Sequence, residues 1–524
     1  MKKTTLFIWL LFCIKIIYCQ SNDAAVYASS ITGEDLKKHL TIIAGADMEG
    51  RETGTSGQRW AAAYIENHFK EIGLVPPPTL SGYQQFYPLF KDSIVSSTLK
   101  INGKKFQPVR DFYLSVKSND AEQVTADQLV FAGYGISEKN YDDYKGKNVQ
   151  GKVVIMFFGE PVLDGKYIVS GTADYSSYTY PGISSKIKIA KEKGAAAVVI
   201  INQASSSIEN YTVINSAADF LPDEPGANLN YIYLSHPGAK KMLHAWKPEQ
   251  LIAKALQLQP LNAENISPIN ASFSLRYKKQ RKQVNASNVI GILEGTDKKD
   301  EYVFLTAHYD HLGIVNGKIY YGADDDGSGT CAVLQMAAAF AKAKAAGYGP
   351  RRSIVFMTVS GEEKGLWGSE HYTNNPVLPL EKTSVDLNTD MIGRIDTERN
   401  KPDTANYVYV VGHDKISTEL GTLNEAVNNK YTQLVIDYKF DDPSDPEQIF
   451  TRSDHYNFAV KGVPVLFFYD GMLKGDYHKP TDTVDKINWA LYEKRTKLIF
   501  YTAWEIANRD KMIKRDLPVP ESTR

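Results

Sequence analysis

Cysteine is scarce in this chain of 524 residues, which has only three. Two of them, Cys13 and Cys19, lie within the first twenty residues, and the third is Cys331. If the N-terminal segment is removed, Cys331 stands alone, which excludes an internal disulfide. We therefore expect Cys331 to pack as a small apolar side chain within a helix, and the fold to depend on burial of its core.

The N-terminal segment has the pattern of a secretory signal. Lys2 and Lys3 precede an apolar stretch over 6–18 that is too short to span a bilayer as an ordinary transmembrane helix. We predict a signal peptide over 1–19 and a secreted or periplasmic protein. Lipid anchoring at Cys19 is the less favoured alternative, because the bulky Tyr18 replaces the small residue that a lipoprotein signal prefers before its cysteine.

Long apolar runs and an excess of either charge are also missing. No other segment has about 18 consecutive apolar residues, so no stable membrane insertion is expected after signal cleavage. The net charge of −1 gives no electrostatic footprint for nucleic acid. A hydrophobic content of 43% and a charged content of 23% are typical of a globular protein, and the length suggests two or three domains.

What the chain does contain is a set of polar residues placed directly after apolar runs. The run 303–307 is typical of a strand buried on both faces, and it ends in His308 and Asp310. Ligands of open α/β sheets bind at the C-terminal ends of the strands. Residues two apart on an extended chain point the same way, so Asp310 could orient the His308 imidazole. A simple cluster of helix-capping residues is the alternative.

Three successive carboxylates, Asp324, Asp325 and Asp326, precede a predicted helix rich in alanine. Capping and the helix dipole account for part of this charge. Three adjacent carboxylates exceed that need and repel one another unless a cation neutralises them. A metal ion is therefore the more economical explanation.

Two further segments repeat the design of a strand that ends in acids. The apolar run 354–359 leads to Glu362 and Glu363, of which one could bind metal while the other transfers a proton. Asp390 ends a region that otherwise resembles a strand, where a carboxylate needs a partner or a metal. His478 follows the predicted strand 463–469 in a polar turn.

The order His-x-Asp, Asp-Asp-Gly-Ser-Gly, Glu-Glu, Asp-Met and Tyr-His-x-Pro-x-Asp-Thr resembles the M28 family of zinc aminopeptidases. The resemblance implies two Zn²⁺ per chain, bridged by Asp325. It implies that Glu363 and His478 complete one zinc site, and that His308 and Asp390 complete the other. It further implies that Glu362 is the general base, that Asp310 supports His308, and that Tyr477 hydrogen-bonds the developing oxyanion.

This resemblance predicts hydrolysis of peptide substrates by activated water, without a covalent enzyme intermediate. Carboxylate and imidazole ligands suit zinc, although cobalt or manganese would accept the same set. The expected fold is α/β, a zinc-peptidase phosphorylase/hydrolase-like fold whose mostly parallel central sheet is flanked by helices. A helix is predicted to close this domain at 488–508, with a frayed tail after it. Residues 48–54 also resemble the N-terminal segment of the family.

Residues 131–161 and 187–202 resemble a different module, the α+β protease-associated (PA) domain. The predicted elements there are strands at 128–134, 152–158 and 195–201 and a helix at 184–193. We therefore place a PA insert at 120–268, between 26–119 and 269–512 of the catalytic domain. The insert is expected to wall one side of the cleft and restrict substrate size.

Other functions remain open on the sequence. An acidic loop at 441–447 would attract a free α-amino group, whereas Arg394 or Arg452 could hold a carboxylate, so a carboxypeptidase or dipeptidase of the same family is an alternative. A glutaminyl cyclase-like transferase would use one zinc. A binding protein with a degenerate site is disfavoured, because such relatives have lost ligands that this chain keeps. The oligomeric state is not predicted.

Overall fold

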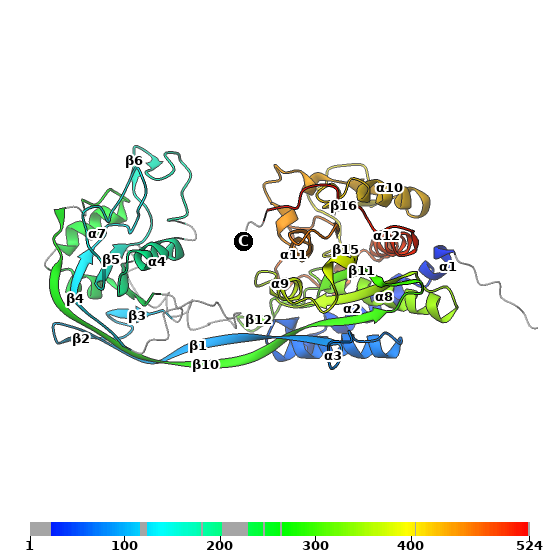
Figure 1. Cartoon of the computed structure of the whole chain (residues 1–524), viewed down its shortest axis with the longest axis horizontal. Helices are drawn as coiled ribbons and strands as arrows, with labels where there is room; N and C mark the ends of the chain where they lie inside the picture. The colour runs from blue at the N-terminus through cyan, green and yellow to red at the C-terminus, as the bar shows by residue number, and fades with distance from the viewer. Residues whose placement is uncertain are drawn as a thin grey trace, which may run out of the picture. The chain divides into compact units, whose positions relative to one another are not determined.

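The computed structural model describes residues 23–115, 123–179, 182–201, 229–244, 247–262, 265–403 and 405–521, so the predicted signal peptide lies outside the described residues. The chain divides into two compact units (Figure 1). Unit 1 comprises Met1–Tyr87 and Asn285–Arg524, and unit 2 comprises Pro88–Val284. Two long strands, β1 (Gln84–Ile101) and β10 (Ile269–Leu293), contribute residues to both units.

Unit 1 contains an α/β sheet in the order β17-β16-β18-β15-β11-β14-β10. The pairs β11–β14, β11–β15, β15–β18 and β16–β17 are parallel, whereas β10–β14 and β16–β18 are antiparallel. The strands are β11 (Lys298–His308), β14 (Arg352–Val359), β15 (Thr383–Thr389), β16 (Tyr407–Val411), β17 (Val435–Asp437) and β18 (Val465–Tyr469), with a small hairpin of β12 (Ile314–Val315) and β13 (Lys318–Ile319). The predicted mostly parallel sheet is thus present.

Helices cover both faces of this sheet. The helices are α1 (Ala24–Ala28), α2 (Gly33–Ile43), α3 (Ser56–Glu71), α8 (Gly327–Ala345), α9 (Trp367–Asn374), α10 (Leu420–Tyr431), α11 (His455–Ala459) and α12 (Trp489–Asn508). Short 3-10 turns are η1 (Ala46–Arg51), η4 (Leu380–Lys382), η5 (Lys439–Asp441), η6 (Ile449–Thr451) and η7 (Val484–Lys486).

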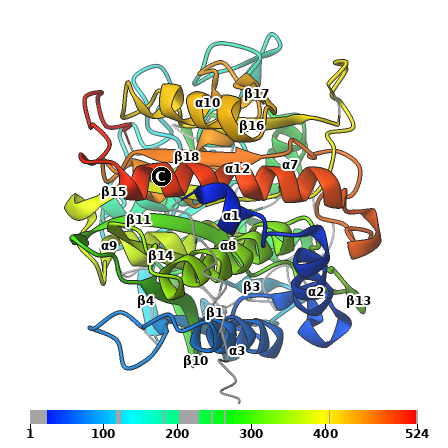
Figure 2. The ribbon, with the colours of Figure 1, turned by 90° about the vertical axis from the view of Figure 1, so that its right-hand side faces the viewer.

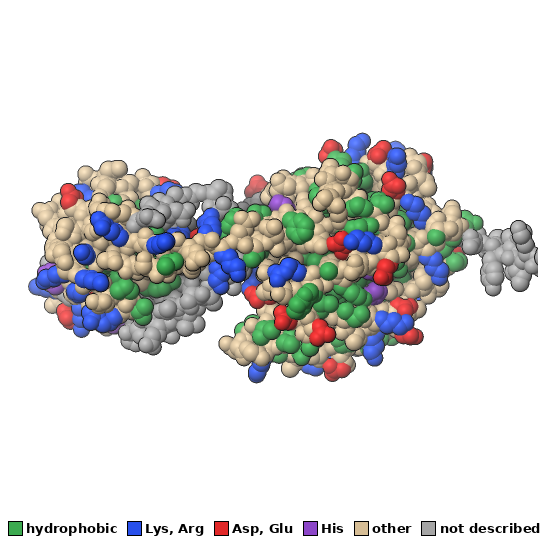
Figure 3. All heavy atoms as spheres, turned by 90° about the horizontal axis from the view of Figure 1, so that it is seen from below, with side chains coloured by type: hydrophobic (Ala, Val, Ile, Leu, Met, Phe, Trp, Pro, Cys, Tyr) green, Lys and Arg blue, Asp and Glu red, His purple; other side chains and the backbone are tan. Residues whose placement is uncertain are grey.

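The side chains of β11 alternate between two hydrophobic cores, one on each face of the sheet. Val303 and Leu305 belong to one core cluster with α8 and α12, whereas Phe304 packs with Tyr372 of α9 and Phe458 of α11. Because successive side chains of a strand point to opposite faces, an uninterrupted apolar run serves a sheet that is covered on both sides. Figure 2 shows α8 and α12 in front of these strands. On the face of unit 1 that Figure 3 draws, acidic side chains (red) and basic side chains (blue) are interspersed.

The sequence predicted the elements of this unit closely. The strands predicted at 303–307 and 354–359 lie within β11 and β14, the strand predicted at 463–469 contains β18, and the helix predicted at 488–508 corresponds to α12. Cys331 is buried in α8, as expected. The expectation of a frayed tail is wrong for part of it, because Ile513 is buried and donates its N–H to Ser384 Oγ at 3.0 Å.

Unit 2 forms its own α/β layer structure with the strand order β10-β4-β5-β8-β9-β3. Its elements are β2 (Lys104–Phe106), β3 (Phe112–Leu114), β4 (Gln123–Phe131), β5 (Val153–Phe157), β6 (Val162–Leu163), β7 (Lys166–Tyr167), α4 (Ile183–Glu192), β8 (Ala197–Ile201), β9 (Tyr231–Leu234), α6 (His236–Met242) and α7 (Pro248–Leu256). The predicted strands and helix of this region correspond to β4, β5, α4 and β8. Unit 2 is larger than 120–268 because β3 pairs with β9 and Leu99 and Phe106 join its core.

A fully buried arginine ties the N-terminal segment to the sheet of unit 1. Arg51 donates hydrogen bonds to four backbone carbonyls, those of Ile43, Tyr309, Tyr321 and Gly322, at 2.7–2.9 Å. The carbonyls belong to segments that are distant in sequence and flank the loop after β11. Residues 48–54 are therefore part of unit 1.

Replacing Arg51 by methionine should lower the free energy of unfolding by about 3–5 kcal/mol, because several buried carbonyls lose their donors at once. Urea unfolding followed by fluorescence measures the change. Arg59→Met on the exposed side of α3 is the matched control, and it should change stability by less than about 0.5 kcal/mol. Equal effects of the two substitutions would contradict a structural role of the Arg51 hydrogen bonds.

Candidate metal centre

The candidate site residues gather at one edge of the unit 1 sheet. His308 is the last residue of β11, Glu362 and Glu363 follow β14, Asp390 follows β15, and His478 lies in the loop after β18. These strands are parallel neighbours, so their C-terminal ends meet at the same edge. The tertiary structure thereby brings together residues that are up to 170 positions apart in the sequence.

The tautomer of His308 follows from its hydrogen bonds. Its Nδ1 lies 3.1 Å from the carbonyl oxygen of Asp310, which can only accept, so Nδ1 carries the hydrogen. The Nε2 atom makes no hydrogen bond and lies 3.3 Å from Asp325 Oδ1 and 3.5 Å from Asp390 Oδ1. Burial alone would lower the pKa of His308, but Glu362 and Asp390 raise it well above the usual value. The imidazole therefore faces a strongly negative environment.

The three successive aspartates have three different roles. Asp324 accepts the backbone N–H of Gly393 at 2.8 Å. Asp326 is the N-cap of α8 and accepts the N–H of Gly329 at 2.7 Å. Only Asp325 has its carboxylate between two histidines, with Oδ1 3.3 Å from His308 Nε2 and Oδ2 3.2 Å from His478 Nε2.

Asp326, His308 and Asp390 each offer a possible ligand atom, and these three atoms lie within 4.8 Å of one another. Its oxygens, however, already accept the backbone N–H groups of His308 and Met391 in addition to that of Gly329. A carboxylate that accepts three backbone N–H groups stabilises the conformation of the surrounding loops. Asp325 is therefore the better bridging candidate.

Two further ligand candidates converge on the other side of Asp325. His478 Nε2 lies 2.9 Å from Glu363 Oε2, and His311 Nδ1 lies 2.6 Å from Glu363 Oε1. Burial raises the pKa of Glu363 and of Asp325, but the surrounding histidines outweigh it and lower both values. The centre thus consists of two groups of side chains that share Asp325, and we call these groups lobes. One lobe contains His308 and Asp390, and the other contains Glu363, His478 and His311.

Asp390 is held in place by the hydroxyl group of Ser453. Ser453 Oγ donates to Asp390 Oδ2 at 2.7 Å and accepts from Asn388 Nδ2 at 2.8 Å. All three side chains are almost fully buried. The Ser453 hydroxyl therefore fixes the direction of the second Asp390 oxygen toward His308.

Replacing Ser453 by alanine should weaken zinc binding at the His308–Asp390 lobe by about 10–100-fold, as expected for loss of an orienting hydrogen bond behind a ligand. The measurement is zinc content against free zinc set by a chelator buffer. Ser444→Ala, in an exposed turn where the hydroxyl contacts only Asp442, is the matched control. Unchanged zinc binding in Ser453→Ala would contradict this role.

Glu362 lies beside the centre and is not closed off from the pocket. Its Oε2 is 3.8 Å from His308 Nε2, and 11% of its side chain is exposed. Burial, together with the nearby Asp390 and Glu363, raises the pKa of Glu362 well above the usual value against the opposing effect of His308. A carboxylate with a raised pKa takes up a proton more readily than an ordinary carboxylate does.

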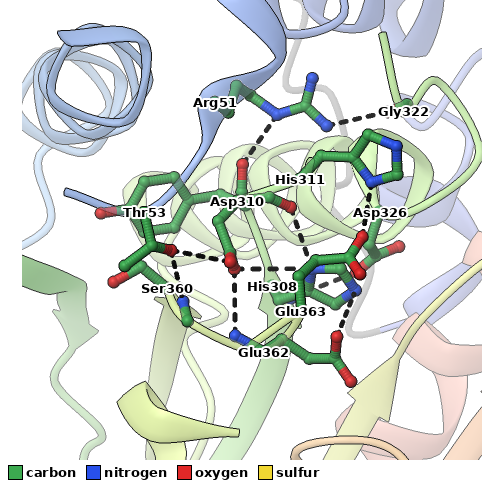
Figure 4. Close-up of polar contacts among 12 residues, drawn as sticks. Arg51, Thr53, His308, Asp310, His311, Gly322, Asp326, Ser360, Glu362 and Glu363 are labelled. Carbon is green, nitrogen blue, oxygen red and sulfur yellow. Dashed lines mark hydrogen bonds and ion pairs between the residues drawn. The ribbon is translucent and has the colours of Figure 1, made fainter. Parts of the chain in front are cut away.

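The Asp310 carboxylate joins the loop after β11 to Thr53 and to the loop after β14. Its carboxylate accepts the Thr53 hydroxyl at 2.7 Å and the backbone N–H of Glu362 at 3.2 Å (Figure 4). Its Oδ1 lies 3.7 Å from His308 Nδ1, whereas its own carbonyl is closer. The predicted support of His308 is therefore given by the backbone oxygen of Asp310, and its carboxylate holds the Glu362 loop.

Tyr477 stacks on His478, with ring centroids 3.8 Å apart. The Arg452 guanidinium donates to the Tyr477 oxygen at 3.3 Å. Because arginine only donates, the phenol hydrogen stays available for another acceptor. Burial and the carboxylates Asp325 and Glu363 raise the pKa of Tyr477, which keeps the phenol protonated.

The donor atoms of the centre fit a metal. Several buried polar atoms there make no hydrogen bond to any residue that the structure describes, namely His308 Nε2, Asp325 Oδ2, Glu363 Oε1 and both ring nitrogens of His311. Buried polar groups normally have partners, so a convergent set without them needs another explanation. Imidazole nitrogens and carboxylate oxygens are the ligands that zinc accepts in catalytic sites.

Sequence reasoning left three contributors to the centre without their roles. His311 was not considered, Ser453 was given no contact with Asp390, and Asp482 was given no role. Asp482 accepts the backbone N–H groups of Asp324 and Asp325 at 3.0–3.1 Å, which ties the His478 loop to the aspartate loop. The only sequence signal for His311 was its place three residues after His308. The signal for Ser453 was its place in the Ser-Asp-His stretch 453–455, which resembles a segment common near the active sites of the family.

A pocket opens beside the centre. Its walls combine apolar side chains with the charged groups of Asp325, Glu362, Asp390 and Arg452. The apolar lining consists of Met391, Ile449, Phe467, Tyr469, Leu473 and the ring of Tyr477. Such a pocket accepts an apolar side chain next to a polar reacting group. Arg394, the other arginine considered from the sequence, is paired with Asp476 at 3.0 Å.

None of the helices that the structure describes combines the length and the hydropathy that a membrane span requires.

Residues 288–503 match peptidase family M28, and residues 121–230 match the PA domain. A probable leucine aminopeptidase from Arthroderma otae is 28% identical over 216 residues, covering 40% of this chain and 55% of that protein. The probable glutamate carboxypeptidase AMP1 from Arabidopsis thaliana is 24% identical, covering 62% and 46%. The chain thus matches about half the length of these relatives.

The fold is also similar to a solved structure, the aminopeptidase from Aneurinibacillus sp. strain AM-1. The similarity covers 95% of this chain and 100% of that chain, with a TM-score of 0.52 and 19% identity. At this level of identity, the comparison supports the fold.

Proposed function

Because the chain contains a peptidase family M28 domain with an inserted PA domain, we propose that it is a dinuclear zinc aminopeptidase that removes N-terminal residues from peptides. The observation that carries this proposal is the position of Asp325 between His308 and His478, beside a pocket that Glu362 lines. His308, Asp390 and Asp325 would hold one zinc ion. His478, Glu363 and Asp325 would hold the other.

Bound zinc would supply Lewis acidity toward the peptide carbonyl and would make water a stronger acid. Glu362 takes a proton from the attacking water and returns it to the leaving amine, which its raised pKa favours. Tyr477 donates its phenol hydrogen to the oxygen that gains negative charge, while Arg452 holds the phenol in place. Asp310 fixes the backbone of Glu362.

A free α-amino group has one carboxylate to pair with in the pocket. Asp325 and Asp390 would be neutralised by the bound zinc, which leaves Glu362, beside the guanidinium of Arg452. The apolar wall would take the side chain of the N-terminal residue, so leucine, methionine and phenylalanine are the expected preferences.

A carboxypeptidase or dipeptidase is the second candidate, and Arg452 is the observation that favours it. Its guanidinium lines the pocket and is half-buried, and it could pair with a substrate carboxylate. Against this, Arg452 already contacts Glu447 and Tyr477, which occupy part of its donor capacity.

The test is release of chromophore from aminoacyl anilides, unblocked or N-acetylated, with metal analysis of the same sample. Hydrolysis of the unblocked leucine compound with about two zinc ions per chain is expected. Hydrolysis of C-terminal substrates alone would replace this function by the second candidate. About one zinc ion with cyclisation of N-terminal glutamine would point to a transferase, and an empty, inactive site would overturn all enzymatic functions.

We further propose that the PA insert restricts substrate size. Ser93 Oγ donates to the carbonyl of Gln280 and Asp92 pairs with Arg281, so β1 and β10 lie side by side where unit 2 begins. Joining Ser93 to Gln280 through an Asn-Gly turn would remove the insert while retaining this pairing. The truncated protein should hydrolyse long peptides better relative to dipeptides than the intact protein does. An unchanged ratio of kcat/KM values would contradict the proposal.

The proposed location is secreted or periplasmic, on the basis of Lys2, Lys3 and the apolar stretch 6–18. N-terminal sequencing of the protein from culture medium and periplasm is the measurement. A mature chain that begins at Gln20 would support the proposal, whereas an uncleaved chain in the cytoplasm would refute it.

A further inference from the structure

His311 is a fully buried histidine at the metal centre that belongs to neither predicted zinc site. It lies in the loop after β11, three residues beyond His308. Figure 4 shows its imidazole turned toward Glu363. Nδ1 is 2.6 Å from Glu363 Oε1 and 3.8 Å from Asp325 Oδ2.

His311 Nδ1 and Glu363 Oε1 lie as two ligands of one metal ion would. Within the part of the chain that the structure describes, neither ring nitrogen of His311 makes a hydrogen bond, and neither does Glu363 Oε1, although Nδ1 and Oε1 are close. The N–H direction therefore does not point at the carboxylate, as it would if His311 served only as a donor. Ligand atoms about 2.1 Å from one zinc ion lie about 3.4 Å apart in a tetrahedron, which falls between the two measured separations.

The opposite side of the same lobe is already lined with ligand atoms. His478 Nε2 lies 2.9 Å from Glu363 Oε2 and 3.2 Å from Asp325 Oδ2. The His311 and His478 rings are 5.9 Å apart, so both face the two carboxylates. We propose that His311 is a fourth protein ligand of this zinc ion, an inference that rests on the proposed function.

The backbone at Gly322 packs closely against the His311 ring. Gly322 has a φ of +54°, and a Cβ atom there would lie 2.5 Å from Cγ of His311. The Gly322 carbonyl is itself fixed by Arg51, which donates to it at 2.8 Å. The imidazole is thus held against Glu363 by a glycine that cannot be enlarged without displacing the ring.

A fourth ligand makes the two lobes unequal. The His311 lobe offers two imidazoles and two carboxylates, whereas the other lobe offers one imidazole, from His308, with Asp325 and Asp390. Imidazole is a favourable zinc ligand, so the first equivalent of zinc should enter the His311 lobe. The second equivalent should bind more weakly and exchange first on dialysis.

X-ray absorption of the full-length protein with one equivalent of zinc tests the assignment. Two imidazoles per zinc are expected in the wild type and one in His311→Ala. The affinity for the first zinc should fall more than about 100-fold in His311→Ala, beyond the range for residues that only orient a ligand. His68→Ala, which removes a ring held between His39 and the Leu334 carbonyl, is the control and should keep both values.

His311→Gln separates ligation from positioning, because glutamine keeps an N–H donor for Glu363. A single imidazole in the wild type, or wild-type affinity in His311→Gln, would overturn the assignment. If the wild type binds two zinc ions and His311→Ala changes neither affinity nor imidazole count, only this inference fails. If the wild type binds no zinc, the proposed function itself fails.

Discussion

Replacement of Glu362 by glutamine should lower kcat by about 10²–10⁴-fold while the zinc content stays unchanged. Glutamine has nearly the same shape as glutamate but cannot take up a proton. Glu362 lies 3.8 Å from His308 without being assigned to either zinc site, so its loss should affect proton transfer and leave the ligands in place. Hydrolysis of leucine anilide, with zinc analysis of the same preparation, measures both quantities.

The control for this experiment is Glu370→Gln, on the exposed side of α9 in the same segment of the chain. It should retain full activity. Loss of zinc in Glu362→Gln would make Glu362 a ligand, and retention of kcat would exclude it as the base. Either result would leave the position of Asp325 as the remaining basis of the proposal.

The second large effect is expected for Asp325→Asn. An amide retains one oxygen acceptor but loses the charge that both histidine lobes share, and the −NH₂ group would face a histidine ring. Affinity should fall by more than about 100-fold for both zinc ions, a larger loss than is typical for an orienting residue. Activity should disappear with the metals. Titration with zinc in a chelator buffer measures both affinities.

Asp300→Asn, on an exposed position of β11, is the control for Asp325→Asn and should bind two zinc ions normally. Loss of only one zinc ion in Asp325→Asn would contradict bridging by Asp325. It would then assign this carboxylate to one lobe. Urea unfolding of both variants separates loss of a ligand from loss of the fold.

The fold was predictable where the pattern of the sequence is strong. The apolar run of β11 is continuous because both faces of the strand are covered, by α8 on one side and by α9 and α11 on the other. The extent of unit 2 was harder to predict, since β3 is only three residues long and pairs with β9, more than a hundred positions later. The tail was misjudged because the burial of Ile513 depends on contacts with distant segments, such as Ser384 of β15, which accepts its N–H.

By itself, the sequence determined which chemistry is available. Carboxylates and histidines after apolar strands, together with the family resemblance, identify the five proposed ligands and Glu362, because parallel strands bring their C-terminal ends to one edge. Only the tertiary structure decided which of three aspartates faces the histidines, that Ser453 fixes Asp390, and that His311 joins the Glu363 lobe. These contacts join residues from different loops, and the side-chain directions in such loops depend on long-range hydrogen bonds that no local pattern records.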